Sequence, residues 1–213
     1  MVKALPKIYP ILDSSVIPAI GRNEFLDRLG GSLADEGVTL LEYRNKGAKD
    51  AQLLADAAIL RGAMPVGQVR LILDDRADLV GRAGFDGVHV DAGDVSPGEA
   101  RRMVGQERIV GTFGGSDSLV PGILDQPADY FSIGPVFTTT TKQTEKRPIG
   151  FEGVQRLRAQ AGPDAVLVAA AGITVETARM VLEAGASMVA VAAALFTKPD
   201  PAAEFRRFLA AVR

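Results

Sequence analysis

The residues best suited to chemistry form one segment, Gly-Pro-Val-Phe-Thr-Thr-Thr-Thr-Lys, which runs from Gly134 to Lys142. It follows a short apolar run at 130–133 and precedes a polar stretch that ends at Gly150. Four hydroxyls and one ammonium group directly after a strand predict an anion site, and a phosphorylated substrate is the anion that this pattern favours. A solvated loop has a similar composition, so the interpretation depends on where the fold places this segment.

Arg44 and Lys46 are further candidates for anion binding. They occupy alternate positions, so both side chains point the same way if the strand before them extends that far. With Lys142 they would bring three cations to one rim, enough to hold a pyrophosphate through charge-assisted hydrogen bonds. The alternative is a set of solvated charges at a strand end.

Asp75 and Asp94 are the carboxylates that we assign to a divalent cation. Magnesium is usually bound by one or two carboxylates together with phosphate oxygens and water. At this position it would neutralise the charge of a leaving pyrophosphate. The alternative is helix N-capping, by Asp74 or Asp75 ahead of Arg76 and by Asp94 ahead of Ser96.

The composition excludes several classes of protein. The 213 residues are 47% hydrophobic, with a mean hydropathy of +0.14, which suits one compact α/β domain. The 24 basic and 26 acidic residues argue against a nucleic-acid partner, and the lack of cysteine excludes disulfides and thiolate metal sites. No apolar stretch is long enough to span a bilayer, and the N-terminal segment lacks the core of a signal peptide. We therefore expect a cytoplasmic protein without a membrane partner.

Short apolar runs alternate with amphipathic segments along the whole chain. The expected strands are 8–13, 39–44, 69–75, 87–90, 109–113, 130–134, 165–171 and 188–192. The expected helices are 22–36, 50–63, 77–84, 97–104, 118–125, 151–161, 175–184 and 201–212. Strands such as 69–73 are apolar almost throughout, which is typical of parallel strands covered on both faces.

Eight such units without a linker predict a single (β/α)8 or TIM barrel over residues 1–213. The alternative is an open doubly wound sheet, but no Gly-x-Gly-x-x-Gly turn follows the first strand. In a (β/α)8 barrel the chemistry takes place at the C-terminal ends of the strands, and these ends are unusually polar in this chain. The threonine-lysine loop and the charged groups above are therefore expected at the same mouth.

Loops after the last two strands commonly bind phosphate in such barrels through backbone N–H groups. Gly172-Ile173-Thr174 and the turn after Ala193 are candidates for this role. His89 is the one histidine of the chain, and it is either a general base or a packed, hydrogen-bonded strand residue. We favour the packed residue.

The motifs, in their order along the chain, resemble those of thiamine-phosphate synthases, and the resemblance covers nearly the whole chain. They are 7–13, Glu42-Tyr43-Arg44-Asn45-Lys46, Leu73-Asp74-Asp75-Arg76, Gly87-Val88-His89-Val90 through Asp94, Gly134-Pro135-Val136-Phe137-x-Thr139-x-Thr141-Lys142 and Ala171-Gly172-Ile173-Thr174. The Gly-Pro…Thr-x-Thr-Lys block is the most specific of them.

The resemblance implies a (β/α)8 barrel that joins a hydroxymethylpyrimidine pyrophosphate to a thiazole phosphate and releases pyrophosphate with Mg2+. The pyrimidine ionises to a carbocation before the thiazole nitrogen attacks it. The resemblance assigns the pyrophosphate to Arg44, Lys46 and Lys142, and magnesium to Asp75 and Asp94. It assigns the thiazole phosphate to Thr139, Thr140, Thr141, Gly172, Ala192 and Ala193, and the pyrimidine pocket to Glu42, Asp74 and Phe113.

The chain departs from the family at several of these positions. Glu42, Asp74 and Phe113 stand where the family usually has glutamine, asparagine and serine, and Ala171 and Ala193 stand where it has glycine and serine. The first two changes add negative charge beside an anion site, and the third adds bulk at the pyrimidine. The pattern predicts either a divergent synthase or a paralogue that binds a thiazole phosphate or a similar phosphorylated ligand without turnover.

Two other activities are less well supported. Related thiazole tautomerases need neither the pyrophosphate cations nor the acidic pair, and their proposed catalytic histidine corresponds to Gly115 here, which argues against tautomerase activity. An aldolase or epimerase barrel is suggested by Glu42 and Lys46, but Lys46 lies beyond the strand end, where a Schiff-base lysine would be poorly desolvated. The sequence leaves open a homo-oligomeric state and whether 136–150 closes as a lid.

Overall fold

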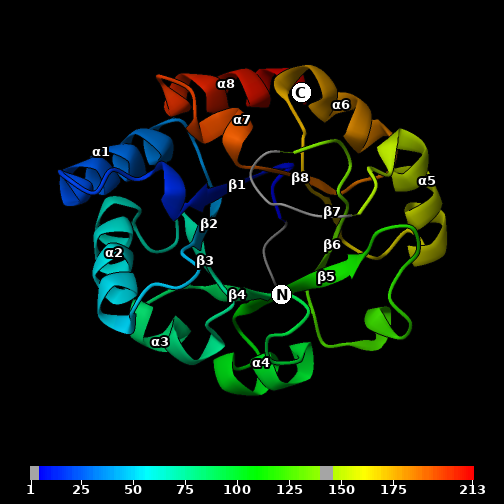
Figure 1. The fold of residues 1–213 in the computed structure, drawn as a ribbon, viewed down its shortest axis with the longest axis horizontal. Coiled ribbons are helices and arrows are strands. Elements are labelled where there is room, and N and C mark those ends of the chain that lie inside the picture. Colours follow the sequence, from blue (N-terminus) through cyan, green and yellow to red (C-terminus); the bar gives the residue numbers. More distant parts are fainter. Residues whose placement is uncertain (1–4, 140–145) are drawn as a thin grey trace.

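The computed structural model of the protein describes residues 5–139 and 146–213. Eight parallel strands close into a barrel in chain order, with β1 paired to β8 (Figure 1). They are β1 Ile8–Asp13, β2 Leu40–Arg44, β3 Arg70–Asp74, β4 Gly87–Val90, β5 Ile109–Gly115, β6 Tyr130–Ile133, β7 Leu167–Ala169 and β8 Met188–Val191. The predicted (β/α)8 barrel is therefore confirmed, and the open sheet is excluded.

The helices surround the strands as an outer ring (Figure 1). They are α1 Arg22–Asp35, α2 Asp50–Ala63, α3 Val80–Ala83, α4 Pro97–Val104, α5 Gly150–Ala161, α6 Val175–Glu183, α7 Ala193–Phe196 and α8 Pro201–Ala211. Within the part of the chain that the structure describes, none of these helices has the length and apolar character needed to cross a membrane.

The connection between β5 and β6 corrects one prediction. The sequence predicts a helix at 118–125, but only a 3-10 turn at Ile123–Asp125 forms there. Pro121 lacks an N–H group and Gly122 adopts a φ of 71°, so a helix cannot continue through them. Leu119 instead folds back to form a bridge with Gly115. The expected helix at 77–84 is likewise shorter, a 3-10 turn followed by α3, and α7 is not predicted by the sequence.

The apolar core has two parts, separated by the wall of the barrel. In β3, Leu71 and Leu73 pack in the larger part, between the strands and the helices, whereas Ile72 packs in the smaller part, inside the barrel. Tyr130 fills much of the interior because its neighbour Gly111 has no side chain. A Cβ at Gly111 would lie 1.9 Å from Cζ of Tyr130. The apolar interior closes the bottom of the barrel and leaves the mouth to polar residues.

Candidate active site

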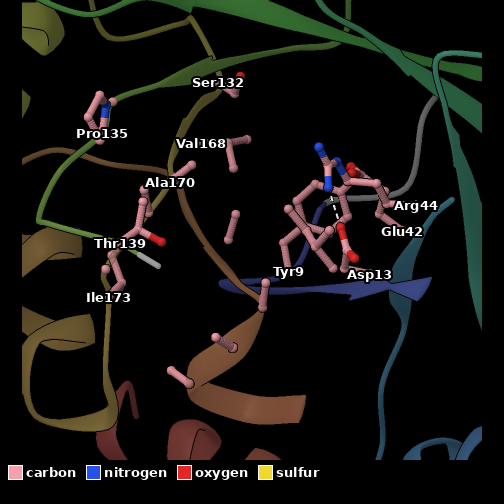
Figure 2. Close-up of a pocket in the computed structure, with 18 of the residues that line it drawn as sticks. Tyr9, Asp13, Glu42, Arg44, Ser132, Pro135, Thr139, Val168, Ala170 and Ile173 are labelled. Atoms are coloured by element: carbon pink, nitrogen blue, oxygen red, sulfur yellow. Dashed lines mark hydrogen bonds and ion pairs between the residues drawn. The ribbon is translucent and has the colours of Figure 1, made fainter. Parts of the chain in front are cut away.

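A cavity of about 580 Å³ opens among the C-terminal ends of the strands, a size that suits a small-molecule site. Figure 2 shows two sides of it: Asp13, Glu42 and Arg44 lie on one, and Thr139 and Ile173 lie on the other. The residues predicted for the site that line this cavity are Glu42, Arg44, Asp74, Phe113, Thr139, Gly172, Ala192 and Ala193.

Arg44 and Lys46 converge on one carboxylate beside the cavity. Nε of Arg44 lies 3.4 Å and Nζ of Lys46 lies 3.7 Å from Oδ2 of Asp74. Arg44 also pairs with Asp13, and Nζ of Lys46 lies 2.7 Å from Oδ2 of Asp75. The structure thus brings the two cations together at one rim. They are paired with carboxylates rather than being independent solvated charges.

The backbone turns sharply at Asp75, whose φ of 65° is rare for residues other than glycine. Its side chain contacts Lys46, and its buried Oδ1 has no hydrogen-bond partner among the residues described. The 3-10 turn that follows has no side-chain cap, and α4 is capped by Ser96, whose Oγ accepts from the N–H of Glu99 at 3.2 Å. The capping alternative is therefore wrong for Asp75 and for Asp94.

Asp75 and Asp94 form an acidic pair whose chemistry suits a divalent cation. Burial raises the pKa of Asp94, and the adjacent Asp75 carboxylate raises it further, against the N–H of Asp91, which donates to Oδ2 of Asp94 at 2.8 Å. Across residues 5–139 and 146–213, no cluster of three or more His, Cys, Asp or Glu could hold a metal. Two carboxylates fit Mg2+, which takes its remaining ligands from water and phosphate oxygens.

Asp74 carries less negative charge than its type suggests. Burial raises the pKa of Asp74 to about 8, and the charges of Glu42 and Asp75 act in the same direction. Lys46 opposes the shift, but Oδ2 of Asp74 makes no hydrogen bond within the described ranges, so burial prevails. At neutral pH this carboxyl is mostly protonated. The conflict that the sequence predicts between Asp74 and a bound anion is correspondingly reduced.

A chain of buried hydrogen bonds crosses the floor of the cavity. The hydroxyl of Tyr9 donates to Oε2 of Glu42 at 2.6 Å, and the hydroxyls of Tyr9 and Tyr130 are 2.8 Å apart. Nδ1 of His89 lies 3.2 Å from the Tyr130 hydroxyl, and its Nε2 lies 3.5 Å from Oδ1 of Asp91. Because Tyr9 donates to Glu42, its oxygen accepts the hydrogen of Tyr130. His89 is thus the packed, hydrogen-bonded strand residue that the sequence favours.

Burial controls the ionisation of this chain. It raises the pKa of Glu42, although the nearby charge of His89 acts in the other direction. It also raises the pKa of Tyr9 and of Tyr130 well above the usual range for tyrosine, so both hydroxyls stay protonated. For His89, burial acts to lower the pKa, but the carboxylates of Asp91 and Glu42 raise it overall. The floor therefore presents a fixed polar edge inside a largely apolar chamber.

The opposite side of the cavity joins the loop after β6 to the end of β7. The N–H of Val136 donates to Ala170 O at 2.8 Å, and the N–H of Phe137 donates to Ala171 O at 3.1 Å. Gly172 has a φ of 69°, and a Cβ there would lie 2.6 Å from Cβ of Phe137. Only glycine lets the two segments approach this closely. The contact holds the first threonines of the loop at the cavity.

Some predicted residues cannot be placed. Thr140, Thr141 and Lys142 lie outside the described residues, and so does part of the segment 136–150, whose closure as a lid the sequence leaves open. Lys46, Asp75 and Asp94 do not line the cavity itself. Lys46 lies beside Asp74, which does line it, Asp75 pairs with Lys46, and Asp94 is adjacent to Asp75.

Sequence reasoning missed Tyr9, Tyr130, Lys146 and Lys198, all of which line the cavity. Tyr9 could have been found, because it shares one face of β1 with Asp13 under the two-residue period of a strand. Tyr130 begins β6 and so lies deep in the barrel, with Gly111 as the clue that a large ring occupies the interior. Lys146 belongs to a loop, for which no periodicity predicts a direction.

Known proteins match this chain along most of its length. The model of the thiamine monophosphate synthase family matches residues 8–195. The chain is 38% identical to the thiamine-phosphate synthase of Koribacter versatilis (strain Ellin345) over 206 residues, 96% of each protein. It is 34% identical to that of Agrobacterium fabrum (strain C58) over 190 residues, 88% of this chain and 86% of the relative. The thiamine phosphate pyrophosphorylase from Pyrococcus furiosus superposes with a TM-score of 0.77 at 25% identity, covering 97% of this chain and 95% of that one.

Proposed function

The chain belongs to the thiamine monophosphate synthase family, and we propose that its barrel mouth joins a hydroxymethylpyrimidine pyrophosphate to a thiazole phosphate, giving thiamine phosphate and pyrophosphate. The enzyme is thus a transferase of thiamine biosynthesis. The observation that carries the proposal is the cluster at the rim, where Arg44 and Lys46 meet Asp74 and Asp75 beside the cavity. Cations for a pyrophosphate and carboxylates for its metal are both needed for this reaction.

The pyrophosphate end of the site consists of Arg44 and Lys46, with Asp75 and Asp94 beside them. The guanidinium and ammonium groups donate charge-assisted hydrogen bonds to phosphoryl oxygens. Asp75 and Asp94 would hold magnesium, which when bound neutralises negative charge on the leaving pyrophosphate. A dissociative reaction requires little more from the protein than stabilisation of its leaving group.

The thiazole phosphate is assigned to the opposite side, where Thr139, Gly172, Ala192 and Ala193 line the cavity. Thr139 offers a hydroxyl, and the other three offer backbone N–H groups free of bulky side chains. The figure supports this division, because Thr139 and Arg44 lie on opposite sides (Figure 2). The two substrates would therefore bind with their phosphates apart and their rings between them. The same roles for Thr140, Thr141 and Lys142 stay predictions.

The inner chamber is assigned to the pyrimidine, and its carboxyl groups suit an amino-substituted ring. A protonated carboxyl offers both a donor and an acceptor, as a primary amide does. Asp74 is largely protonated at neutral pH, and the hydroxyl of Tyr9 holds Glu42 in place. Asp74 can therefore serve where relatives of the family usually carry an amide, and Glu42 offers an acceptor that the Tyr9 hydroxyl holds in place. Phe113 adds an aromatic wall to the same chamber.

Substitution of the acidic pair tests the proposal. The double variant Asp75→Asn, Asp94→Asn should lose magnesium-dependent turnover by about 100-fold or more, the scale on which one group that stabilises a transition-state charge acts. Asp78→Asn is the matched control, because Asp78 is exposed and pairs with Arg76 close to the site in sequence. Full magnesium-dependent turnover by the double variant would contradict the metal assignment. A cytoplasmic location stays a prediction from the sequence, and a homo-oligomeric state stays possible.

A further inference from the structure

Lys198 brings a positive charge to the side of the cavity that is assigned to the thiazole phosphate. It lines the cavity together with Ala192, Ala193 and Thr197, which lie close to it in the chain after β8. Thr174, from the loop after β7, lines the same cavity. The groups assigned above to this phosphate are hydroxyls and backbone N–H groups, and none of them is charged. A phosphate monoester carries close to two negative charges at neutral pH, so a cation at this position would supply what these donors lack.

The backbone that carries Lys198 is fixed on both sides. Before it, Leu195 and Phe196 of α7 are buried, and the N–H of Lys198 donates to Leu195 O at 3.3 Å. After it, Asp200 caps α8, because its Oδ1 accepts from the N–H of Ala203 at 3.0 Å. The Cα of Lys198 is therefore held beside the cavity, while its exposed side chain keeps the freedom to adjust to a ligand.

The charge of Lys198 is available to a ligand, because its side chain takes part in no ion pair among the residues described. Glu176 is the carboxylate on which this charge acts. A hydrogen bond from Thr174 lowers the pKa of Glu176, and the charges of Arg207 and Lys198 add to this effect. Glu176 pairs with Arg207 instead, at 3.7 Å, and both of these side chains are exposed. An exposed carboxylate with another partner leaves the Lys198 ammonium free to bind an anion.

Other cations at the cavity lie elsewhere on its wall. Arg44 is on the opposite side from Thr139 (Figure 2), where carboxylates hold it. Lys146 lies over the ring of Phe113 at the end of β5. Of the lysines and arginines described at the cavity, Lys198 is the one that comes from the loops after β7 and β8. Loops after these strands are the usual phosphate site of a (β/α)8 barrel.

We propose that Lys198 binds the phosphoryl oxygens of the thiazole phosphate and makes the site prefer the phosphorylated thiazole to the free alcohol. The identity of the substrate rests on the proposed function. An ammonium group donates charge-assisted hydrogen bonds to a phosphate but gains much less from a neutral hydroxyl group. Lys198 is thus a binding residue that acts on the phosphate and not on the ring.

The test compares Lys198→Gln and Lys198→Arg with the wild-type protein. Calorimetry gives the Kd of the thiazole phosphate and of the thiazole alcohol, neither of which requires turnover. We expect Lys198→Gln to raise the Kd of the thiazole phosphate by about 5-fold at low salt, the upper end for a partly exposed charge pair, and to leave that of the alcohol unchanged. Lys198→Arg keeps the charge and should bind as the wild type does. Added salt should reduce the effect of Lys198→Gln, because exposed charges are screened.

Two controls make the result specific. Lys49→Gln, at an exposed lysine outside the cavity lining, controls for the loss of one positive charge. The Kd of inorganic pyrophosphate with magnesium reports on the opposite side of the cavity, and Lys198→Gln should not change it.

Three results would overturn the inference. They are a wild type that binds no thiazole phosphate, a loss of affinity in Lys198→Gln no larger than in Lys49→Gln, and an equal loss for pyrophosphate and thiazole phosphate. If the wild type makes no thiamine phosphate but Lys198→Gln still weakens the thiazole phosphate selectively, the proposed function fails and the inference stands.

Discussion

Nζ of Lys46 lies 2.7 Å from Oδ2 of Asp75, so a cation assigned to the pyrophosphate and a carboxylate assigned to its metal neutralise each other in the structure. The pairing explains how both groups are tolerated at one rim in the absence of substrate. The same pairing couples the binding of metal to the binding of pyrophosphate. A metal ion bound to Asp75 would replace Lys46 as the partner of this carboxylate, and Lys46 could then bind the anion. Magnesium and pyrophosphate should therefore favour one another beyond their association in solution.

Asp75→Asn should strengthen the binding of metal-free pyrophosphate, although it removes a proposed metal ligand. The substitution removes the negative charge that pairs with Lys46, so we expect a gain in affinity of about 5-fold in EDTA, at the lower end of typical coupling between sites. With magnesium present, the same variant should bind pyrophosphate more weakly than the wild type. Calorimetry under the two conditions measures both effects, with Asp78→Asn as the control. Weaker binding by Asp75→Asn in EDTA would contradict the coupling.

Glu42→Gln should change how stability depends on pH. Burial raises the pKa of Glu42 in the folded protein above its ordinary value of 4.5. Stability from this group is therefore fully present below pH 4.5 and is lost as the pH rises through the folded pKa. Glutamine does not titrate and still accepts a hydrogen bond from Tyr9, so the Tm of the wild type should fall relative to that of Glu42→Gln as the pH rises above 4.5.

Glu36→Gln is the control for this comparison. The hydrogen bond from Arg206 lowers the pKa of Glu36, so the contribution of Glu36 to stability has the opposite sign and is lost as the pH falls. The two variants should therefore depart from the wild type in opposite directions across the pH range. A pH-independent difference between Glu42→Gln and the wild type would mean that Glu42 has the same pKa in both states.

Asp56→Ala should be strongly destabilising. Asp56 is fully buried between α1 and α2, and it accepts hydrogen bonds from Arg22 at 2.7 and 2.8 Å, from Gln52 at 2.9 Å and from Tyr43. Removing it leaves the partly buried Arg22 unpaired, so we expect a loss of about 3 kcal/mol in the free energy of unfolding.

Urea denaturation measures this loss against Glu183→Ala. Glu183 forms an exposed pair with Arg179 one helical turn away, and its removal should cost at most about 0.5 kcal/mol. Equal losses for the two variants would show that the Asp56 network contributes no more than a surface ion pair.

Gly172→Ala should impair substrate binding more than it impairs folding. The new Cβ would lie 2.6 Å from Cβ of Phe137, so the start of the threonine loop must shift. We expect KM for the thiazole phosphate to rise by about 10-fold, since small displacements at a site are costly. Gly37→Ala is the control, because Gly37 also has a positive φ but a Cβ added there would meet no atom within 4 Å. The positive φ should cost both variants about 1 kcal/mol of stability, Gly172→Ala should lose more because its Cβ also meets backbone atoms, and only Gly172→Ala should change KM.

The barrel could be predicted from the sequence because its strands and helices are set by local patterns of apolar residues. Apolar runs such as 69–73 and the helical periods between them set the strands and helices to within a few residues, and eight repeats leave few topologies. The prediction of a helix at 118–125 was wrong because Pro121 and Gly122 interrupt a helix even where the surrounding residues favour one. Arg44 and Lys46 converge on Asp74 although β2 ends at Arg44, so the alternate spacing of a strand does not account for where Lys46 lies.

The remainder of the site depends on long-range contacts that spacing does not encode. The left-handed backbone at Asp75 has no signature in its residue type, since most aspartates do not adopt that conformation. The bonds from Tyr9 to Glu42 and to Tyr130 join three different strands, and they appear only when the barrel closes. The pKa of Asp74 depends on that same closure, because burial is its main cause.

The most direct test of the account is product formation by the purified protein with magnesium, hydroxymethylpyrimidine pyrophosphate and thiazole phosphate, with thiamine phosphate and pyrophosphate measured in the same sample. The account predicts that the two products appear in equal amounts and that both require all three components. If neither product forms while thiazole phosphate still binds by calorimetry, the account is contradicted. The roles assigned to Arg44, Lys46, Asp75 and Asp94 would then belong to a different reaction.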